Sequence, residues 1–274
     1  MIDIDFVFLQ PKTIGEAIQA YETHLAEGKS VMYYGGGTEF ISRSRHGEID
    51  VDVVIDVTHS QELQTYEIQH EKLVIGAGVT LSSVTDHVLF PLLSKVARGI
   101  ATRTARNKIT IGGNLCSHLP YKEAILPFLL AESTIIIATG KGLVERPIEK
   151  LVELGGNEFL VQILTDKEMV KMPFTHVKRT RQSIINYPIV TMATMDVNRH
   201  LRVAVSGLLG EPIRSKEMEE ILNLRDDTTR KLSEEGLKAM TDNVMEDALA
   251  TKDYRGFVFK NLLQQVLAER KGIL

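Results

Sequence analysis

The chain of 274 residues contains one cysteine, Cys116, and no tryptophan. A single thiol excludes an internal disulfide. It also excludes an iron–sulfur cluster held by cysteines of this chain alone, because such a cluster needs several thiolates. One reduced cysteine is typical of a cytoplasmic protein, and we interpret Cys116 as a small packing residue.

Long apolar runs and an excess of basic residues are also missing. No run approaches the ~20 apolar residues that span a bilayer, so we expect no membrane span. The beginning of the chain, MIDIDFVFLQPKT, is acidic and its apolar part is short, so we expect no signal peptide. The net charge of −4 argues against a sequence-independent nucleic-acid binder, which needs a basic surface. With 43% hydrophobic and 25% charged residues, the composition is that of a globular protein.

The first two thirds of the chain mix strands and helices. Thr13 followed by Glu16 is a capping box, and apolar residues behind it recur at helical spacing. Thr80 is a second N-cap candidate. We expect, in order, a strand at 6–9, a helix at 14–25, strands at 31–34 and 51–57, a hairpin over 63–77, a helix over 91–106, a helical stretch at 123–131 and a strand at 134–138.

A domain boundary is expected near 155–175, where Gly155-Gly156 and Pro173 interrupt the pattern. Three strands are predicted beyond it, at 174–180, 189–197 and 201–208, with the polar Asn-Arg-His turn between the last two. The tail over 215–274 has apolar residues spaced by three and four, which predicts helices.

Two loops with adjacent glycines are the main candidates for a binding site. Gly35-Gly36-Gly37 follows a predicted strand, and Gly112-Gly113 lies in TIGGNL at 110–115. Glycine lets an anion approach the backbone, and successive N–H groups can form an anion-binding nest. Neither loop has the P-loop or the GxGxxG pattern. The loops are therefore either two ordinary tight turns or two sides of one anion site.

Other polar residues give weaker signals. Arg106 and Asn107 fix the geometry of the second loop or contact a phosphate. The eight histidines show no metal-ligand spacing, and no Ser–His–Asp order or paired carboxylate is present. We therefore predict no catalytic residue and no metal site in this chain.

Several segments, in order along the chain, resemble the FAD-binding medium subunit of the molybdenum hydroxylases, the family of the carbon monoxide dehydrogenase and xanthine dehydrogenase flavoproteins. GGGTEF at 35–40 and ARNKITIGGNL at 105–115 are similar to its two glycine loops, and VIGAGVTLSSV at 74–84 is similar to the segment between them. LLAES at 129–133 and two C-terminal stretches, at 201–222 and 253–267, continue the resemblance.

The resemblance implies an α+β chain. It implies a two-subdomain FAD-binding fold of the vanillyl-alcohol-oxidase type at 1–58 and 59–170. A C-terminal flavoprotein domain at 171–274, with a three-stranded antiparallel sheet and helices, would follow. It also implies that both glycine loops lie on the FAD diphosphate.

The implied cofactor-binding residues come from four places in the chain. The first loop would contribute Gly35, Gly36, Gly37, Thr38, Glu39 and Phe40, and the second Arg106, Asn107, Thr110, Ile111, Gly112, Gly113 and Asn114. Glu123 would be a polar anchor near the ribityl and adenosine part, although Leu119 replaces the acid that the family has before it. Tyr187 either covers the flavin ring or packs on the core. Lys178, Arg179 and Arg181 either form a solvated strand face or contact the flavin or an acidic partner.

The implied function is that of an FAD-binding electron-transfer subunit in a molybdopterin-dependent hydroxylase or dehydrogenase complex. Electrons would come from [2Fe–2S] clusters on a small partner subunit, with molybdopterin on a large one, and would pass through FAD to NAD or another acceptor. No catalytic side chain is needed, since the flavin carries the redox chemistry. The alternatives are a stand-alone FAD oxidoreductase and a flavin-free scaffold subunit.

Overall fold

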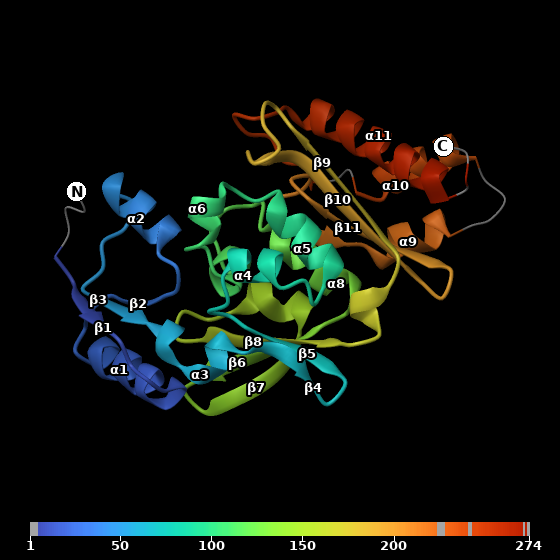
Figure 1. Ribbon diagram of the computed structural model, residues 1–274. Helices are drawn as coiled ribbons and strands as arrows, with labels where there is room; N and C mark the ends of the chain where they lie inside the picture. Colours follow the sequence, from blue (N-terminus) through green and yellow to red (C-terminus); the bar gives the residue numbers. More distant parts are fainter. Residues whose placement is uncertain (1–4, 224–227, 241–242, 271, 273–274) are drawn as a thin grey trace. The chain divides into compact units, whose positions relative to one another are not determined.

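The computed structural model describes residues 5–223, 228–240, 243–270 and 272 (Figure 1). None of the helices in these ranges is both long and apolar enough to cross a membrane. The chain forms two compact units, each built from separate stretches. The first unit takes Met1–Leu89, Thr102–Ser117 and Glu132–Lys167, and the second takes Phe90–Ala101, His118–Ala131 and Glu168–Leu274.

The first unit begins with a small parallel sheet. Its strands are β1 (Val7–Leu9), β2 (Val31–Tyr34) and β3 (Val53–Asp56), in the order β1-β3-β2. Helix α1 (Ile14–Ala26) has the predicted capping box at Thr13 and Glu16. Helix α2 (Thr38–Arg45) was not predicted, because it is short and only one of its hydrophobic side chains, Phe40, is buried.

A five-stranded antiparallel sheet completes the first unit, with the strand order β4-β5-β8-β6-β7. The strands are β4 (Tyr66–Gln69), β5 (Lys72–Gly76), β6 (Thr134–Thr139), β7 (Gly142–Pro147) and β8 (Phe159–Asp166). Strands β7 and β8 were not predicted. Strand β8 lies within the stretch interpreted as a boundary, yet it is the middle strand and pairs with β5 and β6.

Most of the short helical segments lie between β5 and β6 in the chain. The whole set is the 3-10 turn Val57–His59, α3 (Gln61–Gln64), α4 (Leu81–Asp86), α5 (Pro91–Arg98), α6 (Arg103–Arg106), α7 (Ile111–Leu115), the 3-10 turn Glu123–Ile125, α8 (Leu126–Leu130), and the 3-10 turns Ile148–Glu153 and Met169–Lys171. Thr80 caps α4, as predicted.

The prediction of one helix over 91–106 is wrong, because this stretch forms two helices, α5 and α6. Helix α5 ends at Arg98, Ala101 has a positive φ of 50°, and the Thr102 hydroxyl accepts the amide of Ala105 to start α6. A left-handed residue cannot continue a right-handed helix. The division between the two units falls at this break, since α5 belongs to the second unit and α6 to the first.

The second unit is built on an antiparallel sheet of the order β12-β11-β10-β9. The three predicted strands are present as β9 (Phe174–Thr180), β10 (Pro188–Val197) and β11 (His200–Ser206), and a two-residue strand β12 (Ile213–Arg214) makes a fourth. Asn198 and Arg199 form the predicted turn with φ values of 54° and 67°.

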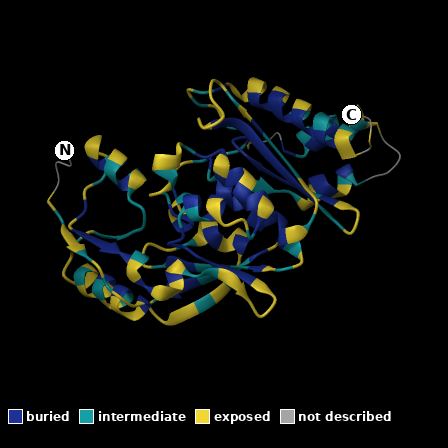
Figure 2. Cartoon of the chain, in the orientation of Figure 1, coloured by how far each residue is buried: buried dark blue, intermediate teal, exposed yellow. Residues whose placement is uncertain are grey.

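Helices cover both faces of this sheet. Residues 188–195 of β10 are all buried, which requires cover on both sides (Figure 2). Helix α8 packs on β10, β11 and β12, while α9 (Lys216–Leu222), α10 (Thr229–Lys238) and α11 (Lys252–Arg270) form the remaining cover and share one apolar core with the strands.

Each of the three sheets draws its strands from one of the three predicted ranges, 1–58, 59–170 and 171–274. Residues 1–4, 224–227, 241–242, 271 and 273–274 of those ranges lie outside the described part. The two compact units are divided differently, because 90–101 and 118–131 join the C-terminal stretch. The three-domain division stays a prediction.

Candidate functional site

The first glycine loop connects β2 to the N-terminus of α2. Gly37 is the N-cap, its φ of 72° is in the left-handed region, and it supplies no side chain to cap the helix. A helix leaves its first N–H groups without intrahelical acceptors and has a partial positive charge there. Thr38 adds an exposed hydroxyl. This end of α2 is therefore suited to an anion such as a phosphate.

The other two residues of the first loop have different surroundings. Glu39 lies in the first turn of α2 and its carboxylate is 3.8 Å from the Arg43 guanidinium. The Phe40 side chain is buried and makes edge-to-face contacts with Phe6 and Tyr34. Only the backbone of Phe40 is therefore available to a ligand at the helix end.

The two glycine loops contact each other within the first unit. A Cβ on Gly36 would overlap the carbonyl oxygen of Lys108, and a Cβ on Gly35 would lie 3.0 Å from the Thr110 hydroxyl. The structure thus brings together two segments that are far apart in the sequence, as predicted. Position 36 requires glycine because the two backbones approach each other closely there. The reason expected from the sequence was a different one, the approach of an anion to the backbone.

The second glycine loop is itself a short helix, α7. Thr110 is its N-cap and accepts the amide of Gly113 at 2.9 Å. The neighbouring amides also have protein acceptors: Ile111 donates to Val79, Gly112 to Ala77 and Asn114 to Thr110, at 2.8–2.9 Å. These amides therefore have partners within the first unit, and the place of the loop on the FAD diphosphate stays a prediction. Its exposed part is Gly113, beside the half-buried Asn114.

Arg106 and Asn107 lie where α6 turns into the second loop. Asn107 is the C-cap residue, and its amide donates to the carbonyl oxygens of Ala105 and Arg103. Arg103 forms two hydrogen bonds to Asp86, at 3.1 and 2.9 Å. These contacts hold the backbone before Lys108, whose carbonyl lies against Gly36, and so support a geometric role for Asn107. The role of Arg106 stays a prediction.

Glu123 lies in the second unit and is buried. Its carboxylate accepts hydrogen bonds from Lys178 Nζ at 2.8 Å and from Thr191 Oγ1 at 2.6 Å. Lys178 also donates to the carbonyl of Gly99 at 2.8 Å. Burial raises the pKa of Glu123, against the opposing effects of Lys178 and Thr191. Both carboxylate oxygens are engaged inside the unit, so the structure does not support the cofactor anchor expected at Glu123.

Lys178 and Arg179 of β9 were predicted to lie on a solvated face of the strand. This prediction is wrong for Lys178, which is buried, and confirmed for Arg179, which is exposed. Tyr187, just before β10, is 52% exposed. Its ring stacks on Tyr121 with centroids 4.9 Å apart and planes at 19°. Its place on the flavin ring stays a prediction.

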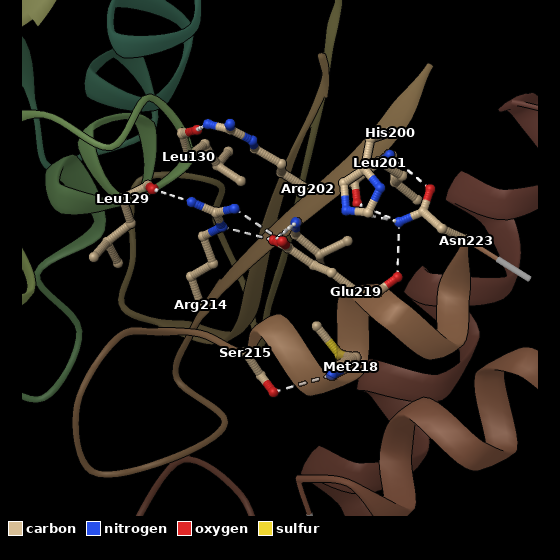
Figure 3. A network of polar contacts seen from close by, with 11 residues as sticks. Leu129, Leu130, His200, Leu201, Arg202, Arg214, Ser215, Met218, Glu219 and Asn223 are labelled. Atoms are coloured by element: carbon tan, nitrogen blue, oxygen red, sulfur yellow. Dashed lines mark hydrogen bonds and ion pairs between the residues drawn. The ribbon is translucent and has the colours of Figure 1, made fainter. Parts of the chain in front are cut away.

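A buried polar network in the second unit was missed (Figure 3). Glu219 accepts from Arg214 Nε at 2.7 Å, Arg214 Nη2 at 2.9 Å and the Val203 amide at 2.8 Å. Arg214 and Arg202 donate to the carbonyls of Leu129 and Leu130. The network lies in the stretch 201–222, one of those that carry the resemblance, and the structure gives Arg214 and Glu219 of this stretch a packing role.

Comparisons with known proteins show the family to which this chain belongs. The sequence model of the FAD binding domain in molybdopterin dehydrogenase matches residues 4–171. The nicotinate dehydrogenase FAD-subunit of Eubacterium barkeri is 21% identical, with 98% of each chain covered. The xanthine dehydrogenase FAD-binding subunit of Escherichia coli O157:H7 is also 21% identical, with 94% of this chain and 93% of that one covered.

The fold has a counterpart in solved structures. A chain of the carbon monoxide dehydrogenase from Hydrogenophaga pseudoflava, in a form which lacks the Mo-pyranopterin moiety of the molybdenum cofactor, superimposes with a TM-score of 0.88. The two are 19% identical, and the match covers 97% of this chain and 96% of that one. The family match includes both glycine loops and more than half of the residues. The chain therefore belongs to the family of FAD-binding domains in molybdopterin dehydrogenases, with FAD as its cofactor and oxidoreduction as its class of chemistry.

Proposed function

We propose that this chain is the electron-transfer flavoprotein subunit of a molybdopterin-dependent hydroxylase or dehydrogenase complex. It would receive electrons from [2Fe–2S] clusters of a small partner subunit and deliver them to NAD or another acceptor. The single cysteine supports this division of labour, because the chain cannot ligate such a cluster with its own thiolates. That cysteine also supports a cytoplasmic location, which stays a prediction.

The observation that carries the proposal is the N-terminus of α2. Its N-cap residue, Gly37, has a left-handed backbone and no capping side chain, and the second glycine loop lies directly beside Gly35 and Gly36. We place the FAD diphosphate on these amides and on the Thr38 hydroxyl. Since the first-turn amides of α7 are already bonded, Gly113 and Asn114 would border the diphosphate and supply the Asn114 side chain rather than an amide nest.

FAD supplies the electron and hydride chemistry when it is bound. The residues of this chain bind and orient the cofactor, and none of them has to act as an acid, a base or a nucleophile. The names of two relatives, a nicotinate and a xanthine dehydrogenase subunit, support a complex that would oxidise a small heterocycle on its molybdenum subunit.

The proposal is tested with the purified full-length chain and added FAD. We expect flavin absorbance bands that remain after gel filtration, and reduction of this flavin by an iron–sulfur partner co-purified from the native source. A chain that stays colourless after incubation with FAD would favour the flavin-free scaffold. A chain that holds FAD but oxidises a substrate without any partner would favour the stand-alone oxidoreductase.

A further inference from the structure

The buried ammonium group of Lys178 has one more hydrogen-bond donor than the chain supplies acceptors for. It donates to Glu123 Oε2 and to the Gly99 carbonyl, both at 2.8 Å, and the Lys178 side chain is 1% exposed. An ammonium group has three N–H donors, and the described residues provide no third acceptor. A buried donor without an acceptor is costly, so a further partner is expected at this position.

His176, two residues before Lys178, offers a buried acceptor. The two side chains lie on the same face of β9, opposite Val177, which packs on the apolar core that the sheet shares with α10 and α11. The Nε2 atom of His176 is buried and has no hydrogen-bond partner in the described part of the chain. Burial, followed by the effects of Lys178 and Lys95, lowers the pKa of His176 to about 4. The imidazole is therefore neutral at neutral pH, and one of its ring nitrogens can accept a hydrogen bond.

Helix α5 adds a third polar group without a partner. Lys178 reaches the Gly99 carbonyl at the end of α5, so this helix packs on the face of β9 that carries Lys178 and His176. Ser94 of α5 is 2% exposed, and its hydroxyl makes no hydrogen bond to any described residue. The adjacent Lys95 acts electrostatically on the His176 imidazole, which brings this turn of α5 close to His176.

We propose that the second unit binds one internal water molecule between α5 and β9. The water accepts a hydrogen bond from Lys178 Nζ, donates one to His176 Nε2 and makes a third with the Ser94 hydroxyl. Buried waters typically make about three hydrogen bonds, to buried polar groups that would otherwise be unsatisfied. The site therefore joins the helix to the strand through polar contacts, and it does not depend on a bound cofactor.

The charges around the site favour water over an ion. The Glu123 carboxylate lies 2.8 Å from Lys178 Nζ and balances its charge, and His176 is neutral. A metal cation would be repelled by the ammonium group, and an anion would face the lone pair of the imidazole. A water molecule both donates and accepts, so it satisfies the ammonium donor and the imidazole acceptor at once.

The direct test is a crystal structure of the full-length chain that shows ordered water. We expect one peak of solvent density at about 2.7–3.2 Å from Lys178 Nζ, His176 Nε2 and Ser94 Oγ. A crystal soaked in bromide identifies the ligand, because an anomalous peak at this position would mean an anion and would overturn the water. Side chains that close on one another with no density between them would overturn the site itself.

A second test counts long-lived internal waters in solution by magnetic relaxation dispersion of the water signal. His176→Leu replaces the acceptor with an apolar side chain and should lose one such water relative to the parent chain. Arg179→Leu, at an exposed residue of the same strand, is the matched control and should keep the parent number. A folded His176→Leu variant that keeps this number overturns the proposal. If the variant does not fold, the crystal structure of the parent chain still decides the outcome.

Discussion

Lys178 and Glu123 form an ion pair that is almost completely shielded from water. Their charged atoms are 2.8 Å apart, and their side chains are 1% and 5% exposed. The pair connects β9 to the 3-10 turn before α8, and Lys178 adds a hydrogen bond to Gly99 at the end of α5. Three separate stretches of the second unit therefore meet at one ammonium group.

Lys178→Ala is expected to destabilise the protein severely. Removing one partner of a buried pair leaves an uncompensated charge, which costs about 3–5 kcal/mol. The free energy of unfolding from urea titration measures this. The double variant Lys178→Met, Glu123→Leu should lose much less, because no charge is left behind. Arg179→Ala, at the exposed neighbour on β9, should stay within about 0.5 kcal/mol of the parent chain. Equal losses for the single and the double variant would contradict this account.

We expect the free energy of unfolding to fall in mild acid because of His176. Burial, with smaller effects of Lys178 and Lys95, lowers the pKa of His176 to about 4 from its ordinary 6.5. Between these values the unfolded chain binds a proton that the folded chain does not, so stability falls as the pH drops from about 6.5 to about 4. The full effect is on the order of 3 kcal/mol.

The measurement is the pH dependence of unfolding for the parent chain and for His176→Gln. The difference between the two curves isolates this histidine, since the opposite contribution of Glu123, whose pKa is raised, is present in both. Arg179→Gln, at an exposed residue of the same strand, is the control and should follow the parent curve. Parallel curves for the parent and His176→Gln would show that His176 titrates normally.

The contact between the two glycine loops predicts the effect of a single methyl group. Gly36→Ala would place its Cβ on the Lys108 carbonyl, so the loops must separate, at a cost of about 1–3 kcal/mol. We expect weaker FAD retention, measured by flavin absorbance after gel filtration. Gly15→Ala in α1 meets no atom within 4 Å and should stabilise the chain by about 0.5–1 kcal/mol with unchanged FAD retention. Full FAD retention in Gly36→Ala would mean that the loop contact does not shape the site.

Local signals in the sequence predicted the local features of the fold. The capping box at Thr13, the Thr80 cap and the Asn-Arg-His turn each depend on residues within four positions of one another, and all three are present. The proximity of the glycine loops came from the resemblance. The resemblance did not show that position 36 needs glycine to make room for the Lys108 carbonyl, because tertiary packing sets the position of that carbonyl.

The errors arose where distant residues decide the conformation. Strand β8 depends on β5 and β6 on either side of it. The amides of α7 were expected to be open, but Val79 and Ala77 from an earlier stretch accept two of them. Lys178 looked solvated in a basic run, since nothing in its neighbourhood shows that Glu123 is packed against it.

Helix α9 carries two adjacent glutamates with different surroundings, since Glu219 is buried and Glu220 is exposed. The Glu219 side chain is 2% exposed and accepts three hydrogen bonds, two of them from Arg214, which is itself 6% exposed (Figure 3). Glu219→Ala would leave the Arg214 charge and the Val203 amide buried without the carboxylate. Unfolding should then require about 3–5 kcal/mol less, measured by urea titration. Glu220→Ala changes an exposed carboxylate on the same helix, so it should stay within about 0.5 kcal/mol. If the two variants unfold alike, Arg214 finds water or another acceptor when Glu219 is removed, and the network does not hold β12 and α9 together.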